Sequence, residues 1–494
     1  MQTPAQHDAR RSGVTYDIVD AAYFKKRGLR RYAGIWSLWA LGVGAVISGH
    51  FSGWNLGLAS GGWGGMMIAG GVMAVMFLCL SFCIAEMSAA LPLGGGSYAF
   101  ARVALGPFWG FVSGLCEHIE YVLTPAVICY FIGAYLGAIF GPGVPEIVWW
   151  VGTYAVFVAL NMVGVALTFR ITLGITLASL AVLIVFCGMG LPQIDIGRWA
   201  LNIAADGSLL PGGHGPFLPM GWGGVLASLP FAVWLYLAIE ELPLAAEETI
   251  DPVRDMPKGI LLALATLILS GFAIMAINPA LPGVGSWQLA RSGEPVLLGF
   301  RALMHGVGAE VLGLVALSGL VASFHAILFA QGRQIFALSR SGYLPRGLSL
   351  TNGARKTPVL AMLAGAGLGL AIMIALRLTL AEAAGTVIGG VLLQMAVFGA
   401  MLSYISRAAA FLALRRDRPD LPRPFKSPVG RSGAWITIVI SLLTLVCQVQ
   451  DPAFLDGTVW VVIWLMLGTG YFLLFARHRL VLSPEEQAAL ALPE

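Results

Sequence analysis

Four polar side chains interrupt a long apolar run of the sequence at helical spacing: Glu117, Glu120, Tyr121 and Thr124. Because residues three, four and seven positions apart lie on one face of an α-helix, all four would point the same way. Carboxylates beside an aromatic ring could bind an organic cation or carry protons, and ionisable residues in spanning helices face an interior cavity. In the alternative interpretation, the two carboxylates are structural and cap the ends of neighbouring helices.

Two other apolar stretches contain residues that do not favour helices. Residues 42–55, GVGAVISGHFSGWN, bring glycines, serines and a histidine to the middle of an uncharged run. Residues 221–252 include Pro230 and Pro243 within the apolar part and the acidic pair Glu240 and Glu241 between them. Backbone groups freed by a helix break are costly in lipid, so a polar cavity or ligand must satisfy them. We therefore expect both helices to be unwound at mid-membrane, although the glycines alone could also serve close helix packing.

The composition is typical of a protein with many membrane-spanning helices. Hydrophobic residues make up 58% of the chain and charged residues only 11%, whereas a soluble chain would carry about a quarter charged residues. Runs long enough to span a bilayer fall at 34–58, 63–90, 107–140, 147–169, 171–191, 221–246, 259–279, 307–337, 358–377, 384–412, 434–449 and 457–476. We expect an all-α polytopic membrane protein with twelve transmembrane helices.

Several classes of protein do not fit this sequence. The six cysteines all lie within the apolar runs, so we expect free thiols, no metal site and no cofactor. The chain lacks the H-E-x-x-H and G-x-S-x-G motifs of common hydrolases, and we expect no enzyme activity. The small net positive charge does not indicate a nucleic-acid partner, because the charges are sorted by membrane side.

Lysine and arginine alternate between the two sides of the predicted membrane. With the N-terminus in the cytoplasm, 24 of the 29 fall on the cytoplasmic side, and Arg170 lies at a helix junction. Only four fall outside: Arg198, Arg291, Arg301 and Arg377. The positive-inside rule then predicts a multi-pass protein of a bacterial inner (plasma) membrane, in contact with the lipid bilayer, with both termini cytoplasmic. The sequence carries no signal of oligomeric state.

The two interrupted helices are the first and the sixth, which occupy corresponding positions in two five-helix halves. Interrupted helices at matching positions are typical of transporters built from inverted repeats. We expect six segments: a cytoplasmic N-terminal segment (1–32), a first repeat (33–191), an extracellular loop (192–220), a second repeat (221–412), two further helices after a basic loop (413–476) and a cytoplasmic tail (477–494).

Three stretches carry a resemblance to a known family: AEMSAALPLGGGSYAFARVALGPFWGF (85–111), AAEETIDPVRDMPKGI (245–260) and GRQIFALSRSGYLP (332–345). They resemble the signatures of the amino acid–polyamine–organocation transporters. Within that superfamily, GAVISGHFSGWN, EHIEYVLTPAV and ASFHAILFAQGRQIFALSRSGYLP look like the ethanolamine permease branch. The resemblance implies ten core helices in a five-plus-five inverted repeat, two extra C-terminal helices, and secondary active transport.

The resemblance also implies roles for particular residues. Glu117 falls at a position that lines the substrate cavity, Trp234 matches a gating aromatic, and Glu240 matches an acidic position associated with proton sensing. Ala238 stands where many members have glycine, so the break could be tighter than usual. Trp234 and Tyr236 could instead belong to a belt of aromatic residues at the lipid interface.

The first helix indicates which substrate would fit. Amino acid transporters of this superfamily hold the substrate carboxylate on a glycine-rich turn, and the equivalent triplet here is Ser48-Gly49-His50. His50 would crowd that subsite, and nearby acidic side chains would repel a carboxylate. We therefore expect a small organic amine, ethanolamine in particular, with its hydroxyl near Ser48 and His50. The candidate substrate-binding residues are Ile47, Ser48, Gly49, His50, Glu117, Glu120, Tyr121, Trp234, Tyr236, Ala238, Glu240, Ser323 and His325.

Protons are the coupling ion that we expect, with Arg170, Glu240 and Trp234 as coupling or gating residues. Sodium-coupled relatives use hydroxyls of helix eight, where the stretch LVASFHAI of this chain offers a single serine, Ser323. Arg170 could lock helix five to helix one, or could simply anchor a cytoplasmic helix end; His325 could line the cavity or pack in the core. The alternatives are permeases for cationic or neutral amino acids or choline-like amines, uncoupled diffusion of the cation, and a nutrient sensor that does not transport.

Overall fold

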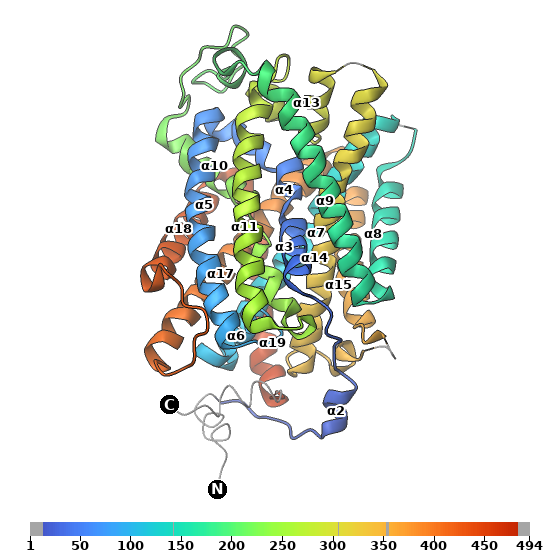
Figure 1. The fold of residues 1–494 in the computed structure, drawn as a ribbon, viewed down its shortest axis with the longest axis vertical. Helices are drawn as coiled ribbons and strands as arrows, with labels where there is room; N and C mark the ends of the chain where they lie inside the picture. Colours follow the sequence, from blue (N-terminus) through green and yellow to red (C-terminus); the bar gives the residue numbers. More distant parts are fainter. Residues whose placement is uncertain (1–12, 142, 305, 352–354, 483–494) are drawn as a thin grey trace.

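The protein is a bundle of roughly parallel and antiparallel helices, seen from the side in Figure 1. The computed structural model describes residues 13–141, 143–304, 306–351 and 355–482. In these ranges, extended pairing is limited to three isolated bridges. The predicted N-terminal segment and tail lie partly outside the described residues. The all-α polytopic class predicted from the composition is confirmed.

Ten stretches of the described chain are long and apolar enough to span a membrane. Their helices are α5 (Leu58–Ala90), α7 (Pro107–Phe140), α8 (Glu146–Val163), α9 (Val165–Gly190), α11 (Pro252–Ile277), α14 (Val307–Arg340), α15 (Val359–Leu380), α17 (Leu393–Asp417, preceded by α16, Ala384–Thr386, and the π-helix η9, Val387–Leu392), α18 (Gly430–Gln450) and α19 (Leu455–Leu474). Shorter helices include α2 (Ala21–Lys25), α6 (Ser97–Leu105), α12 (Gly285–Leu289) and α13 (Pro295–Leu303).

The first and sixth predicted helices are the two that are too short to span. Their apolar segments run only over Ile35–Phe51 and Gly221–Val233. If each of these two broken helices is counted as one membrane-spanning helix, the total is twelve. That total stays a prediction. The predicted boundary between the fourth and fifth helices is wrong: the fourth helix ends at Val163 and not at 169, and the fifth begins at Val165 and not at 171. Gly164 lies between the two helices with φ +139°, a backbone conformation that glycine adopts readily and other residues rarely adopt.

The first helix is divided into α3 (Ile35–Val46) and α4 (Ser48–Phe51). In a continuous helix, the Ser48 N–H would bind the Gly44 carbonyl. Here the Ser323 hydroxyl of α14 lies between them: it accepts from Ser48 N (2.8 Å) and donates to Gly44 O (2.6 Å). One side chain thus satisfies two of the backbone groups that the break frees, as a break at membrane depth requires.

The sixth helix changes from α10 (Gly221–Val233) to the 3₁₀ helix η4 (Ile239–Glu248). Between them, Ala238 adopts a left-handed conformation with φ +81°, which is unfavourable for a residue with a Cβ. The two breaks touch, because any Cβ at Gly49 would overlap the Trp234 carbonyl oxygen. The indole of Trp234 likewise covers Gly53. The helix breaks predicted from the glycines and prolines are therefore present and packed against each other.

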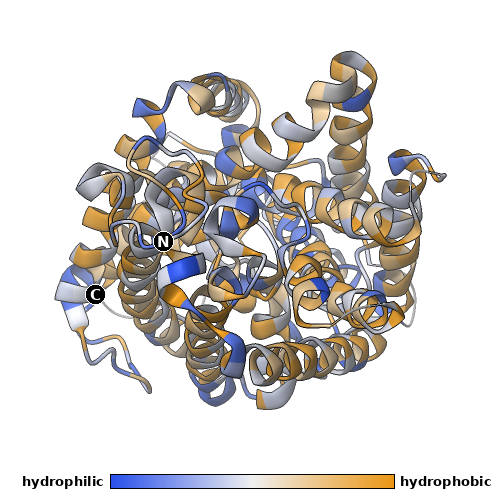
Figure 2. Cartoon of the chain, turned by 90° about the horizontal axis from the view of Figure 1, so that it is seen from above, coloured by the Kyte–Doolittle hydropathy of each residue, from blue (hydrophilic) through white to orange (hydrophobic). Residues whose placement is uncertain are grey.

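The outside of the bundle is apolar, as contact with lipid requires. Figure 2, which looks down the bundle, shows hydrophobic residues on helices around its perimeter. Large apolar side chains such as Ile184, Leu269 and Leu474 are exposed there. The hydrophobic surface of this protein thus extends over whole helix faces, whereas soluble proteins rarely expose contiguous patches beyond a few hundred Å².

The two ends of the described chain meet at one end of the bundle, which we call the terminal face. Thr15 N donates to Arg477 O (2.7 Å) and Leu480 N donates to Thr15 O (3.1 Å). Asp17 forms an ion pair with Arg346 beside them. At the other end, the opposite face, Asn55 beyond α4 donates to carbonyls of the 279–306 loop. Helix one therefore runs from the terminal face to the opposite face.

We predict that Ser323→Ala lowers the free energy of unfolding by about 1–3 kcal/mol, because it leaves a buried donor and acceptor of helix one unpaired. Unfolding of the purified protein in mixed micelles measures this. Ser318→Ala is the matched control, because the Ser318 hydroxyl of the same helix has no hydrogen-bond partner among the described residues. Equal stability of the two variants would contradict the role given to Ser323.

Candidate functional site

The acidic stripe of α7 meets the broken sixth helix in the interior of the bundle. Glu117, Glu120 and Tyr121 are fully buried, and so is Glu240 of η4. The side chain of Glu240 is an electrostatic neighbour of Glu120. The four carboxyl oxygens of the two residues have no hydrogen-bond partner in the described chain. Buried carboxyl groups without a partner are costly when they are ionised.

Arg407 of α17 supplies a cation to this cluster. Its guanidinium forms an ion pair with Glu117, and the two side chains are 1% and 0% exposed. It also donates to the backbone carbonyl of Glu240 (3.4 Å) and lies over the Tyr404 ring at 5.7 Å. Arg407 therefore ties together α7, α17 and the broken sixth helix.

The position of Arg407 corrects the charge assignment made from the sequence. That assignment placed Arg407 among the cytoplasmic charges, although it lies within the predicted helix 384–412. In the structure Arg407 is buried in the bundle, because Glu117 provides an ion-pair partner there. The sequence alone does not reveal that these two residues meet. The sequence did contain one indication of this role: an arginine inside a predicted membrane-spanning run, which by default indicates a functional site.

The cluster has more carboxyl groups than cations. Glu241 is buried beside Glu240, and its carboxyl oxygens also have no hydrogen-bond partner in the described chain. The carboxylate of Glu117 accepts a second hydrogen bond from Gln334 Nε2 of α14 (3.4 Å). Among the described ion pairs, Arg407 is the one cation that reaches any of these four carboxyl groups. The region can therefore accept protons or a further cation.

Aromatic rings line the path between the cluster and the first helix. Phe77 packs on Tyr404 (5.4 Å between centroids) and on Tyr236 (5.5 Å). The Tyr236 hydroxyl donates to Gly70 O (3.4 Å), and Trp234 lies on the glycines of helix one. Both Trp234 and Tyr236 are buried, so they do not form an interfacial belt. Aromatic faces of this kind attract organic cations.

His50 joins the two helix breaks. Its Nε2 lies 3.3 Å from the Leu235 carbonyl of the unwound segment, and its Nδ1 lies 3.2 Å from Ser270 Oγ of α11. The neighbouring Ile47 and Ser48 form the break in helix one itself. His50 thus stands beside the break, where the sequence placed it; its effect on a substrate carboxylate stays a prediction.

Two predicted residues lie elsewhere. His325 Nδ1 accepts from Asn161 Nδ2 of α8 (2.8 Å), and its ring contacts Phe157, so it packs on the far side of α14. Arg170 is exposed and donates to the Tyr32 hydroxyl (3.0 Å), just before helix one. The structure brings neither residue to the acidic cluster.

A second group of ion pairs lies between the cluster and the terminal face. Arg333 of α14 binds Glu248 at the end of η4 (2.8 Å), and Arg340 pairs with Glu247. The Glu248 carbonyl also accepts from the backbone of Tyr32, where helix one begins. None of these four ion-paired residues is among the candidate site residues predicted from the sequence. Together they close the space between α14 and the sixth helix.

Comparison with known proteins agrees with this architecture. A family model described as amino acid permease matches residues 34–473. The methylthioribose transporter of Bacillus subtilis (strain 168) is 24% identical over 94% of this chain and 97% of its own length. The branched-chain amino acid permease BcaP of the same organism is 25% identical over 92% and 95%. The aromatic amino acid transport protein AroP of Escherichia coli O157:H7 is 24% identical over 90% and 95%. Because the family model covers most of its length, this chain belongs to the amino acid permease family.

Proposed function

We propose that this chain imports a small organic amine, with ethanolamine as the first candidate, by secondary active transport coupled to protons. The observation that carries the proposal is the buried excess of carboxyl groups around Glu117, Glu120, Glu240 and Glu241. An ionised carboxylate without a partner is costly in a low-dielectric interior. The cluster is therefore balanced by protons or by a bound cation, and symport of a proton with an ammonium would use both.

The surroundings of the cluster support an amine over an anionic group. An ammonium that enters beside Glu120 and Glu240 gains carboxyl oxygens that have no hydrogen-bond partner outside this pair. The rings of Tyr121 and Tyr404 lie near the same carboxyls and add cation–π attraction. A substrate carboxylate would meet repulsion from these acids and would depend on Arg407, which is already paired with Glu117.

Alternating access requires that each side of the cluster can open in turn. Towards the terminal face, the ion pairs of Arg333 and Arg340 hold α14 against the sixth helix. Towards the opposite face, Trp234 covers Gly53 of helix one. We propose that breaking the ion pairs opens the cytoplasmic side, and that moving Trp234 opens the outer side. In this proposal the terminal face is cytoplasmic and the membrane is the plasma membrane of a bacterium.

The second candidate is a permease for amino acids. The relatives named above include transporters of branched-chain and aromatic amino acids, and Arg407 offers a cation that a substrate carboxylate could bind if Glu117 released it. Choline-like amines would fit the same acidic and aromatic surroundings as ethanolamine. A sensor on the same fold would bind ligand without flux, and the uptake experiment below separates it from a transporter.

We predict that purified protein in proteoliposomes takes up labelled ethanolamine and that an inward proton gradient accelerates this uptake. Uptake with and without the gradient is the measurement, and unlabelled choline, leucine, tryptophan, lysine and methylthioribose serve as competitors. Ethanolamine uptake that is unchanged after the gradient is collapsed would exclude proton coupling. Competition or thermal stabilisation by amino acids but not by ethanolamine would favour the second candidate.

We predict that Glu117→Gln and Glu120→Gln, tested separately, each reduce ethanolamine uptake at least about tenfold, because each removes a charged partner worth about 1.5–3 kcal/mol. Glu146→Gln is the control, because Glu146 forms an exposed ion pair with Arg377 on the bundle surface (3.7 Å). Thermal unfolding of each variant separates loss of recognition from loss of folding. Normal binding and transport in both cluster variants would place the substrate site elsewhere.

We predict that His50→Gly shifts selectivity towards amino acids that carry an α-carboxylate. The change removes the ring beside the break of helix one, and we expect the ratio of ethanolamine to leucine uptake to fall about tenfold, or about 1.4 kcal/mol. His325→Gln is the matched control, because His325 contacts α8 and not the breaks. An unchanged ratio in His50→Gly would show that His50 does not select against the carboxylate.

A further inference from the structure

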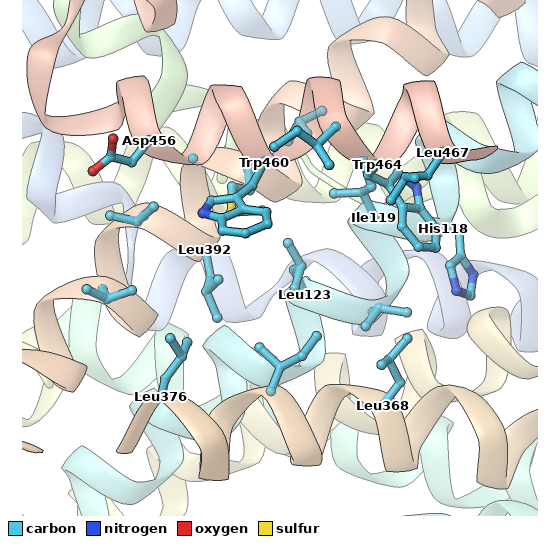
Figure 3. Close-up of a pocket in the computed structure, with 18 of the residues that line it drawn as sticks. His118, Ile119, Leu123, Leu368, Leu376, Leu392, Asp456, Trp460, Trp464 and Leu467 are labelled. Atoms are coloured by element: carbon cyan, nitrogen blue, oxygen red, sulfur yellow. The ribbon is translucent and has the colours of Figure 1, made fainter. Parts of the chain in front are cut away.

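A long apolar cavity of about 750 Å³ lies between α7, α15, α17 and α19, away from the acidic cluster. Figure 3 shows α15 and α19 along its two sides, with Asp456 at one end and His118 at the other. On α15, the lining residues recur every fourth position from Leu368 to Leu380. At 1.5 Å per residue this row is about 18 Å long, which is close to one leaflet of a hydrocarbon core about 30 Å thick.

The cavity begins at the opposite face of the bundle. Its lining helix α19 begins at Leu455, and the chain beyond the end of α19 reaches the terminal face at Arg477. Asp456, in the first turn of α19, therefore lies at the end of the cavity that is nearest the opposite face. It is exposed and has no hydrogen bond or ion pair with any described residue. Trp460, one turn deeper and 62% exposed, lies beside it in Figure 3.

These features define an occupant with two parts. Below Trp460 the lining side chains are apolar over the depth of a leaflet, which fits a hydrocarbon chain. At the mouth, a free carboxylate and an indole together suit a cationic amine, since carboxylates pair with ammonium groups and indoles attract them. Trp460 lies near the end of its helix, the depth at which tryptophan is enriched in membrane proteins. An anionic headgroup would be repelled by Asp456.

The deep end of the cavity is connected to the acidic cluster. Trp464, which lines the cavity, stacks on His118 at 5.8 Å between ring centroids. His118 Nδ1 lies 3.4 Å from Gln334 Oε1, and Gln334 Nε2 donates to Glu117 (3.4 Å). An occupant that packs against Trp464 therefore touches a chain of side chains that ends at the carboxylate paired with Arg407.

We propose that this cavity binds an acyl chain of a zwitterionic aminophospholipid, such as phosphatidylethanolamine, from the leaflet at the opposite face. The headgroup ammonium lies at Asp456 and Trp460, and the acyl chain extends towards Trp464 and His118. The bound lipid supports the spacing of α7 and α17, the helices that carry Glu117 and Arg407. The proposal does not depend on which substrate the protein transports.

Native mass spectrometry of the full-length protein, released from nanodiscs with matched acyl chains, tests the proposal. We expect retention of phosphatidylethanolamine at least about tenfold above phosphatidylglycerol. Leu376→Trp fills the cavity and should abolish the retained lipid, whereas Leu378→Trp should not, because Leu378 is 73% exposed on the same helix and does not line the cavity. Asp456→Asn should remove the preference between headgroups and keep binding through the acyl chain.

Cross-linking provides a second measurement that does not depend on the folding of any variant. Phosphatidylethanolamine with a diazirine in its acyl chain should label α15 and α19 of the wild-type protein at the cavity-lining residues. Equal retention of both lipids, equal loss in Leu376→Trp and Leu378→Trp, or labels spread evenly over the bundle surface would each overturn the proposal. A dimer without bound lipid in the native mass spectrum would assign the cavity to a second copy of the chain.

Discussion

The hydroxyl of Ser323 is the contact on which the arrangement of the two broken helices depends. It replaces one missing hydrogen bond of helix one, because it accepts from Ser48 N and donates to Gly44 O. Ser323 lies at least 275 residues further along the chain than these two residues. Because a side chain satisfies these two freed backbone groups, it lowers the cost of a break at membrane depth. The break in turn lets Gly49 approach the Trp234 carbonyl, so that the two broken helices meet.

Arg407 has a corresponding role for the charges. A buried ion pair gains little net stability because both partners lose their hydration, but removing one partner leaves an expensive unpaired charge. Glu117 is therefore committed to Arg407 unless another cation replaces it. The carboxyl oxygens of Glu120 and Glu240 have no hydrogen-bond partner among the described residues. Glu117 therefore also holds helices together, whereas Glu120 and Glu240 have no structural partner that the proposed substrate or proton would have to displace.

The features that the sequence predicted are those that rest on local spacing. The stripe of α7 follows from helical periodicity, and the two breaks follow from glycines, prolines and charges inside apolar runs. The partners of these groups come from distant segments, and one sequence gives no information on such pairings. Arg407 was for this reason counted with the cytoplasmic charges, and the sequence left His325 open between the cavity and the core, where the structure shows it held by Asn161. The end of α8 depends on the conformation of Gly164, which composition does not encode.

The occupied hydrogen bonds of Ser323 also bear on the proposed coupling ion. Its hydroxyl has a single hydrogen, which it gives to Gly44, and it accepts from Ser48. A metal cation that took this oxygen as a ligand would have only one lone pair available, because a hydroxyl oxygen has two and the Ser48 N–H uses the other. The acidic cluster, by contrast, has carboxyl oxygens of Glu120 and Glu240 without a hydrogen-bond partner among the described residues. The proposed coupling of protons through that cluster therefore leaves the two hydrogen bonds of Ser323 in place.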